Sequence, residues 1–157
     1  MDILLISNED MCRSRIAQEL FTSFGRGMKI FTAGITEGSS VPQVVCDVMQ
    51  HHGYEVSRKK PSSVSIYTNR PWDYVLTLSK EAEEEYKYMN LQTQDVSHLH
   101  FEDALQHATL DADEIEEQVE ALYADMYHNL YEFYRDELSE RLMPRCTCGA
   151  NTYCRCE

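Results

Sequence analysis

One stretch near the N-terminus decides the fold: residues 3–14 read Ile3-Leu4-Leu5-Ile6-Ser7-Asn8-Glu9-Asp10-Met11-Cys12-Arg13-Ser14. The continuous apolar run at its start is typical of a strand that is buried on both faces of a parallel sheet. From Arg13 to Phe24 apolar residues recur at helical spacing, and Gly25 follows where a helix commonly ends. The stretch therefore predicts a strand, a short loop and a helix in immediate succession.

The loop of this unit, Ser7 to Ser14, has the layout of an oxyanion-binding loop. In such a junction the backbone N–H groups point into one concavity, and the helix N-terminus adds a partial positive charge. Arg13 can give a tetrahedral anion two parallel hydrogen bonds, which a lysine could not. A cysteine at the first position would be held as a nucleophilic thiolate, but this chain has Ser7 there.

On these residues the chain resembles the low-molecular-weight protein tyrosine phosphatase and arsenate reductase superfamily, whose motif is Cys-x-Gly-Asn-x-Cys-Arg-Ser. The chain departs from the motif at Ser7, Glu9 and Asp10, which stand at the cysteine, glycine and asparagine positions. In the family, the residue that matches Ser14 hydrogen-bonds the nucleophile and helps to hold it ionised. The resemblance implies an anion bound by the whole loop: Asn8, Glu9, Asp10, Met11, Cys12, Arg13 and Ser14.

The resemblance also implies catalytic positions at Ser7, Arg13 and Asp103. Asp103 lies in a stretch similar to the one in which the family carries its general acid, although Ala104 replaces the proline that follows that acid. An aspartate that caps the next helix is an equal alternative for Asp103. Cys12 is interpreted as a small buried residue behind the loop.

The rest of the chain is similar to the same family from residue 1 to residue 142. Met28 to Gly34 and Asp73 to Ser79 resemble its second and third strands, and Asp111 to Leu142 its closing helix. We therefore predict an α/β fold: a Rossmann-like four-stranded parallel sheet with helices on both faces and the oxyanion loop after the first strand. Four tyrosines at helical spacing are predicted to widen the buried face of the closing helix, namely Tyr123, Tyr127, Tyr131 and Tyr134.

Turnover by Ser7 is not expected, because a serine hydroxyl needs an adjacent general base and the loop supplies none. Two explanations for Ser7 stay open: a cysteine replaced by serine to trap substrate, or a natural serine in a protein that binds without turnover. Glu9 and Asp10 favour natural divergence, since a trap needs neither change. If the loop requires a positive φ, Glu9 would cost about 1 kcal/mol there, whereas Asp tolerates left-handed geometry better.

The ligand implied by the resemblance is phosphate, a phosphotyrosine-like ester or arsenate. Arsenate reductases carry relay cysteines after the third strand, and the stretch Ser79 to Tyr86 contains none. The chain is thus interpreted as a phosphatase or arsenate reductase relative without turnover, or as a pseudophosphatase that binds phosphate or a phosphopeptide. The core reaction of the family needs no cofactor.

A cysteine-rich extension, residues 143–157, follows the phosphatase-like domain of residues 1–142. Its two Cys-x-Cys pairs flank a short turn and could close a tetrahedral zinc site formed by Cys146, Cys148, Cys154 and Cys156. A redox role, a trivalent arsenic or other soft-metal site, two plain disulfides and disorder are the alternatives.

Charge and hydropathy limit the partners of the chain. The formal net charge of −13 argues against binding to nucleic acid and to anionic membranes. No apolar run approaches the length needed to span a membrane, and the N-terminus is not of the secretory type. A cytoplasmic location is therefore predicted.

Overall fold

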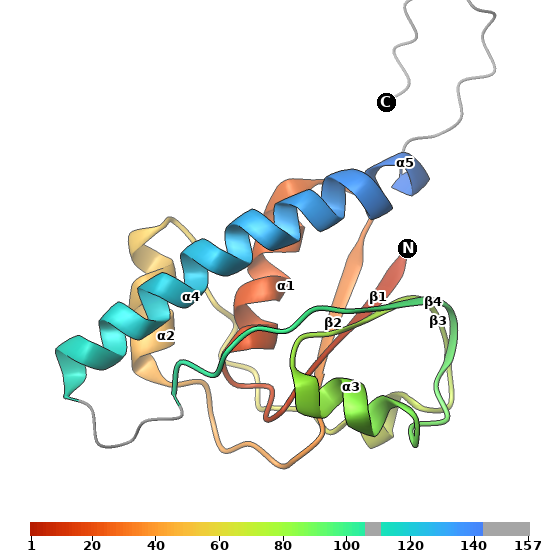
Figure 1. The fold of residues 1–157 in the computed structure, drawn as a ribbon, viewed down its shortest axis with the longest axis horizontal. Helices are drawn as coiled ribbons and strands as arrows, with labels where there is room; N and C mark the ends of the chain where they lie inside the picture. Colours follow the sequence, from red (N-terminus) through yellow and green to blue (C-terminus); the bar gives the residue numbers. More distant parts are fainter. Residues whose placement is uncertain (106–110, 143–157) are drawn as a thin grey trace, which may run out of the picture.

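The computed structural model describes residues 1–105 and 111–142. Four strands form one parallel sheet in the order β2-β1-β3-β4 (Figure 1): β1 (Asp2–Ser7), β2 (Lys29–Gly34), β3 (Pro71–Thr77) and β4 (Gln92–His98). The apolar run Ile3 to Ile6 is buried because β1 lies between two neighbours and is covered on both faces. The predicted four-stranded parallel sheet is confirmed.

Helices cover both faces of this sheet, as predicted. On one face α1 (Arg13–Phe24), α2 (Gln43–His51) and α4 (Ala112–Phe133) pack around a core that includes Phe21. Figure 1 shows α4 lying across α1 and α2. On the other face, α3 (Lys80–Tyr86) and the 3₁₀ turn η1 (Val64–Tyr67) cover a smaller core around Trp72.

The predicted closing helix has the expected extent but contains a change of winding. Asp111 caps α4 by accepting a hydrogen bond from the Glu114 N–H at 2.9 Å. The chain then passes through a π-helical segment, η2 (Tyr134–Leu138), and ends in α5 (Ser139–Leu142). An apolar stripe along this segment faces the core, with Val119, Leu122, Met126, Leu130 and Leu138 buried.

The predicted role of the tyrosines on this helix is wrong for two of them. Tyr127 and Tyr131 are 43% and 44% exposed, while Tyr123 and Tyr134 are partly buried. The two exposed rings stack on each other with centroids 6.5 Å apart and meet the edge of Phe24. The helical spacing is confirmed, but these rings lie at the border of the buried stripe, where a tyrosine keeps its hydroxyl in water.

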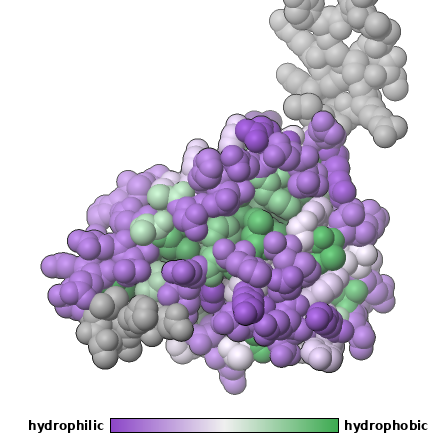
Figure 2. Space-filling view, in the orientation of Figure 1, coloured by the Kyte–Doolittle hydropathy of each residue, from purple (hydrophilic) through white to green (hydrophobic). Residues whose placement is uncertain are grey.

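The surface is largely hydrophilic in the view of Figure 2, with a band of apolar residues between α4 and the sheet. No helix within residues 1–105 and 111–142 is long and apolar enough to cross a membrane. The predicted division of the chain at residue 142, and its cytoplasmic location, stay predictions.

Met126 and Tyr127 are adjacent in α4, and they test which side chains belong to the core and which lie at the border of the buried stripe. Met126→Ala should lower the free energy of unfolding by about 2–4 kcal/mol, because Met126 is fully buried and truncation leaves a cavity. Tyr127→Ala should cost less than half as much, since Tyr127 is 43% exposed. Urea titration of both variants measures the difference, and equal losses would contradict this description of the helix.

Candidate functional site

The Ser7–Ser14 loop rests on the end of β2. The N–H groups of Ile35 and Thr36 donate to the carbonyls of Ser7 and Asn8 at 3.1 and 2.8 Å. A Cβ atom on Gly34 would lie 2.9 Å from the carbonyl carbon of Glu9, so only glycine fits there. The backbone of β2 therefore fixes the first half of the loop.

Asp10 sits at the turn of the loop with φ of 54° and is fully buried. Its Oδ1 accepts a hydrogen bond from the Ser14 hydroxyl at 2.7 Å, and its Oδ2 accepts from Arg15 Nη2 at 3.2 Å and from the Ser62 N–H at 2.9 Å. Asp10 thus adopts the left-handed geometry that aspartate tolerates better than most residues. Glu9 has no positive φ, so the cost expected for it does not arise.

Arg15 completes this buried network. Its Nε donates to the Asp10 carbonyl at 3.2 Å, and its Nη1 donates to the Ser57 carbonyl at 3.4 Å. Arg15 and Asp10 are 2% and 0% exposed, and the ion pair therefore cancels the charge of Asp10 inside the protein. The pair of Asp10 and Arg15 thus places no net charge behind the loop.

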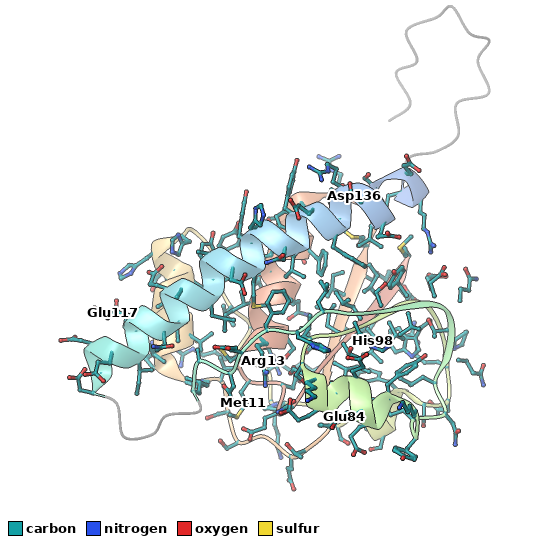
Figure 3. All side chains as sticks on the ribbon, in the orientation of Figure 1. Met11, Arg13, Glu84, His98, Glu117 and Asp136 are labelled. Carbon is teal, nitrogen blue, oxygen red and sulfur yellow. The ribbon has the colours of Figure 1, made fainter. Side chains whose placement is uncertain are left out.

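A cavity of about 250 Å³ opens above the loop. The loop contributes Ser7, Asn8, Glu9, Met11, Cys12 and Arg13 to its wall, and the segment after β4 contributes Asp103 and Leu105. Figure 3 shows Met11 and Arg13 close together at the start of α1. The structure thus brings the three predicted catalytic positions to one cavity, whereas the side chains of Asp10 and Ser14 bond each other and do not line it. The functional roles of these residues stay predictions.

Ser7 is buried, with 2% of its surface exposed. Its hydroxyl accepts a hydrogen bond from the Asp10 N–H at 3.2 Å. Within residues 1–105 and 111–142, no carboxylate or imidazole is hydrogen-bonded to this hydroxyl. Ser7 therefore lacks a general base that would activate it.

Arg13 spans the cavity from the loop to the segment that carries Asp103. Its Nη1 donates to the Phe101 carbonyl at 2.9 Å, and the residue is 6% exposed. In the described part of the chain, no carboxylate forms an ion pair with Arg13. The guanidinium is thus held in place by a neutral acceptor and keeps its positive charge available to an anion.

Cys12 is buried and has a free thiol. Burial, and to a smaller extent the negative charge of Asp103, raise the pKa of Cys12 to about 12, against the opposing effect of Arg13. The thiol is therefore protonated at neutral pH and is no substitute for a nucleophile at position 7.

Asp103 accepts a hydrogen bond from the Leu105 N–H at 2.9 Å through Oδ1. This bond forms a local turn, while α4 has Asp111 as its N-cap. The position of Asp103 on the cavity wall suits the general-acid alternative, because a proton donor has to reach the bound group.

Sequence reasoning missed two supports of the loop. Ser79 caps α3 and donates from its hydroxyl to Asn8 Oδ1 at 2.6 Å. Arg15 was missed although the sequence carries a signal for it. The first turn of α1 holds two arginines and no acidic residue, and basic side chains are unfavourable at a helix N-terminus unless a carboxylate pairs with them.

The four tail cysteines lie outside the described residues. Within residues 1–105 and 111–142, no group of three or more His, Cys, Asp or Glu side chains is placed to hold a metal ion. The zinc site at Cys146, Cys148, Cys154 and Cys156 therefore stays a prediction.

The sheet order and the arginine-bearing loop between β1 and α1 define a parallel α/β protein with a candidate site at the carboxyl edge of its sheet. The sequence model described as "Low molecular weight phosphotyrosine protein phosphatase" matches residues 2–142, and the chain belongs to this family. The resemblance seen in the sequence is confirmed. No curated protein sequence matches the chain at a significant level.

Solved structures share the fold at low sequence identity. Arsenate reductase from Archaeoglobus fulgidus is 19% identical, with a TM-score of 0.66 over 85% of this chain and 99% of that one. The YwlE arginine phosphatase, a mutant with a phosphorylated active-site serine, is 19% identical with a TM-score of 0.56, over 91% and 100%. Wzb from Vibrio vulnificus, in complex with benzylphosphonate, is 12% identical with a TM-score of 0.58, over 82% and 97%.

Removal of the arginine tests the Asp10–Arg15 pair. Arg15→Met leaves a buried carboxylate without its counterion, and the free energy of unfolding should fall by about 3 kcal/mol at neutral pH. Asp10→Asn in the same chain should recover most of this loss, because the amide carries no charge. Urea titration of the parent, both single variants and the double variant gives the coupling energy, and additive effects would contradict the pairing.

The Cys12 thiol should resist alkylation in the folded protein at pH 8, because its pKa is raised to about 12. The partly exposed Cys46 provides the internal comparison. The unfolded chain releases the Cys12 proton near pH 9 and the folded chain does not, so Cys12 should lower stability as pH rises above 9. Peptide mapping after labelling checks the first expectation, and labelling of Cys12 as fast as Cys46 would contradict it.

Proposed function

We propose that the Ser7–Ser14 loop binds a phosphate-like oxyanion, namely phosphate, a phosphotyrosine-like ester or arsenate, and that the chain with Ser7 does not turn it over. The observation that carries the proposal is Arg13, a buried cation without a carboxylate partner in the described chain, on a cavity lined mostly by residues of the loop. The N-terminus of α1 supports it further, since no side chain caps the helix at Cys12.

The charges around the cavity limit the affinity. Glu9 and Asp103 belong to its wall and oppose a dianion, while Arg13 attracts one. We therefore expect weak binding that falls as the ionic strength rises. The Vibrio vulnificus Wzb complex with benzylphosphonate supports a phosphate-like ligand, because it has the same fold.

The groups around position 7 support the proposed lack of turnover. Ser7 has no general base in the described chain, and the raised pKa keeps Cys12 protonated. These observations favour a binding module of the pseudophosphatase kind, which would hold phosphate or a phosphopeptide. The place of Asp103 on the cavity wall favours descent from an enzyme in which a thiol attacked phosphorus and an acid protonated the leaving oxygen.

A phosphorylated active-site serine is present in the YwlE mutant structure. By analogy, Ser7 could accept one phosphoryl group: the P–O bond to the leaving group breaks, a bond to Ser7 Oγ forms, and the hydroxyl proton goes to the leaving oxygen. Such a single transfer is compatible with the proposal, whereas repeated hydrolysis is not.

Calorimetric titration with inorganic phosphate tests the proposal. Arg13→Ala should weaken binding at least tenfold, because it removes the cation and its paired hydrogen bonds. Arg70→Ala is the matched control: Arg70 pairs with Asp2 at the opposite end of β1, so this variant should bind like the parent. Glu9→Gln should raise the affinity by about two- to fivefold, since it removes a negative charge near the anion.

No measurable phosphate binding by the parent would contradict the binding role. An aryl phosphate given to the same preparations checks the absence of turnover. Sustained hydrolysis by the parent that disappears in Ser7→Ala would overturn the claim, and intact-mass analysis would reveal a phosphoryl group held on Ser7.

A further inference from the structure

The hydroxyl of Ser14 donates its only proton to the carboxylate of Asp10. A serine hydroxyl has one proton to donate, and Ser14 gives it to the Asp10 carboxylate at 2.7 Å. A carboxylate has no proton of its own to give back. The oxygen of Ser14 therefore faces an acceptor, and its proton is not available to any other group.

Asp10 also contacts position 7 directly. Its N–H donates to Ser7 Oγ at 3.2 Å, so the two hydroxyls of Ser7 and Ser14 both bond this one residue. An anion formed at position 7 would find the Asp10 N–H as a donor but no proton from Ser14. The Asp10 carboxylate would also oppose that anion, although its ion pair with Arg15 weakens the effect.

We propose that Asp10 is a positioning residue that silences position 7: its carboxylate holds the Ser14 proton and neutralises Arg15, so that Ser7→Cys alone does not create a reactive thiolate. The proposal deepens the proposed function, because it assigns the loss of turnover to a second residue besides Ser7.

Asp10→Asn would exchange the donor and the acceptor in the hydrogen bond between residues 10 and 14, because an amide has nearly the same shape as a carboxylate but carries an NH₂ donor. The amide oxygen takes the place of Oδ2, where it accepts from Arg15 Nη2 and from the Ser62 N–H. The amide NH₂ then takes the place of Oδ1 and donates to the Ser14 oxygen. Ser14 is released to donate its proton elsewhere, and the Arg15 guanidinium is left without its counterion.

The test measures the pKa of the thiol introduced by Ser7→Cys, from the pH dependence of its alkylation in the folded protein. Peptide fragmentation separates this thiol from Cys12 and from the other native cysteines. In Ser7→Cys alone the thiol should titrate near or above the ordinary cysteine value of about 8.5. In Ser7→Cys with Asp10→Asn, the thiolate fraction at neutral pH should rise at least about tenfold, which is one pKa unit.

Ser14→Ala is the control that separates the role of the Ser14 proton from a general structural effect of the substitutions. In the Ser7→Cys chain with Asp10 intact, Ser14→Ala should leave the alkylation profile unchanged, because the Ser14 proton is already held by Asp10. In the chain with Asp10→Asn, the same change should raise the thiol pKa again. The first comparison needs no asparagine variant, so it decides the question even if that variant is unstable.

Two results would overturn the proposal: a thiol pKa already well below the ordinary value in Ser7→Cys alone, or a rise in pKa on Ser14→Ala while Asp10 is present. These measurements need no phosphate and differ from the calorimetric titration of the parent. A parent that fails to bind phosphate would contradict the proposed function alone, and a low pKa in Ser7→Cys would contradict only the role of Asp10.

Discussion

The loop depends on the fully buried carboxylate of Asp10. Four donors on it or on its carbonyl come from Ser14, Ser62 and Arg15, and together they hold a left-handed turn with φ of 54°. A buried charge of this kind is stable only when it is paired and hydrogen-bonded, and Arg15 supplies the counter-charge. The turn at Asp10 is therefore held by this pair.

The parallel sheet supplies the other half of the site. All four strands end at the same edge, so the segments that follow them meet there although they are far apart in sequence. Ser79 after β3 fixes Asn8 at 2.6 Å, and the Phe101 carbonyl after β4 fixes Arg13 at 2.9 Å. The position of the cavity therefore depends on the order of the strands. Asn8 and Arg13 on its wall are each fixed by a hydrogen bond to a segment that follows a different strand.

The sequence was sufficient for features that repeat. The buried run of β1, the helical spacing of α1 and α4, and the arginine of the loop follow from periodicity and a local motif. The contact of Asp10 with Ser62 could not be predicted, since it joins residues 52 positions apart and no local pattern encodes that pairing. The exposure of Tyr127 shows the same limit, because spacing gives a face of a helix but not where its buried stripe ends.

Ser7, Asp10 and Arg15 are best understood together. An uncharged residue at position 10 would leave Arg15 as a buried cation without a counter-charge, and a neutral residue at position 15 would leave Asp10 as an unpaired anion. Each of the two therefore constrains the other. Serine at position 7 does not account for this pair, because Ser14 and Arg15 donate to the Asp10 carboxylate, whereas the Ser7 hydroxyl accepts from the Asp10 N–H.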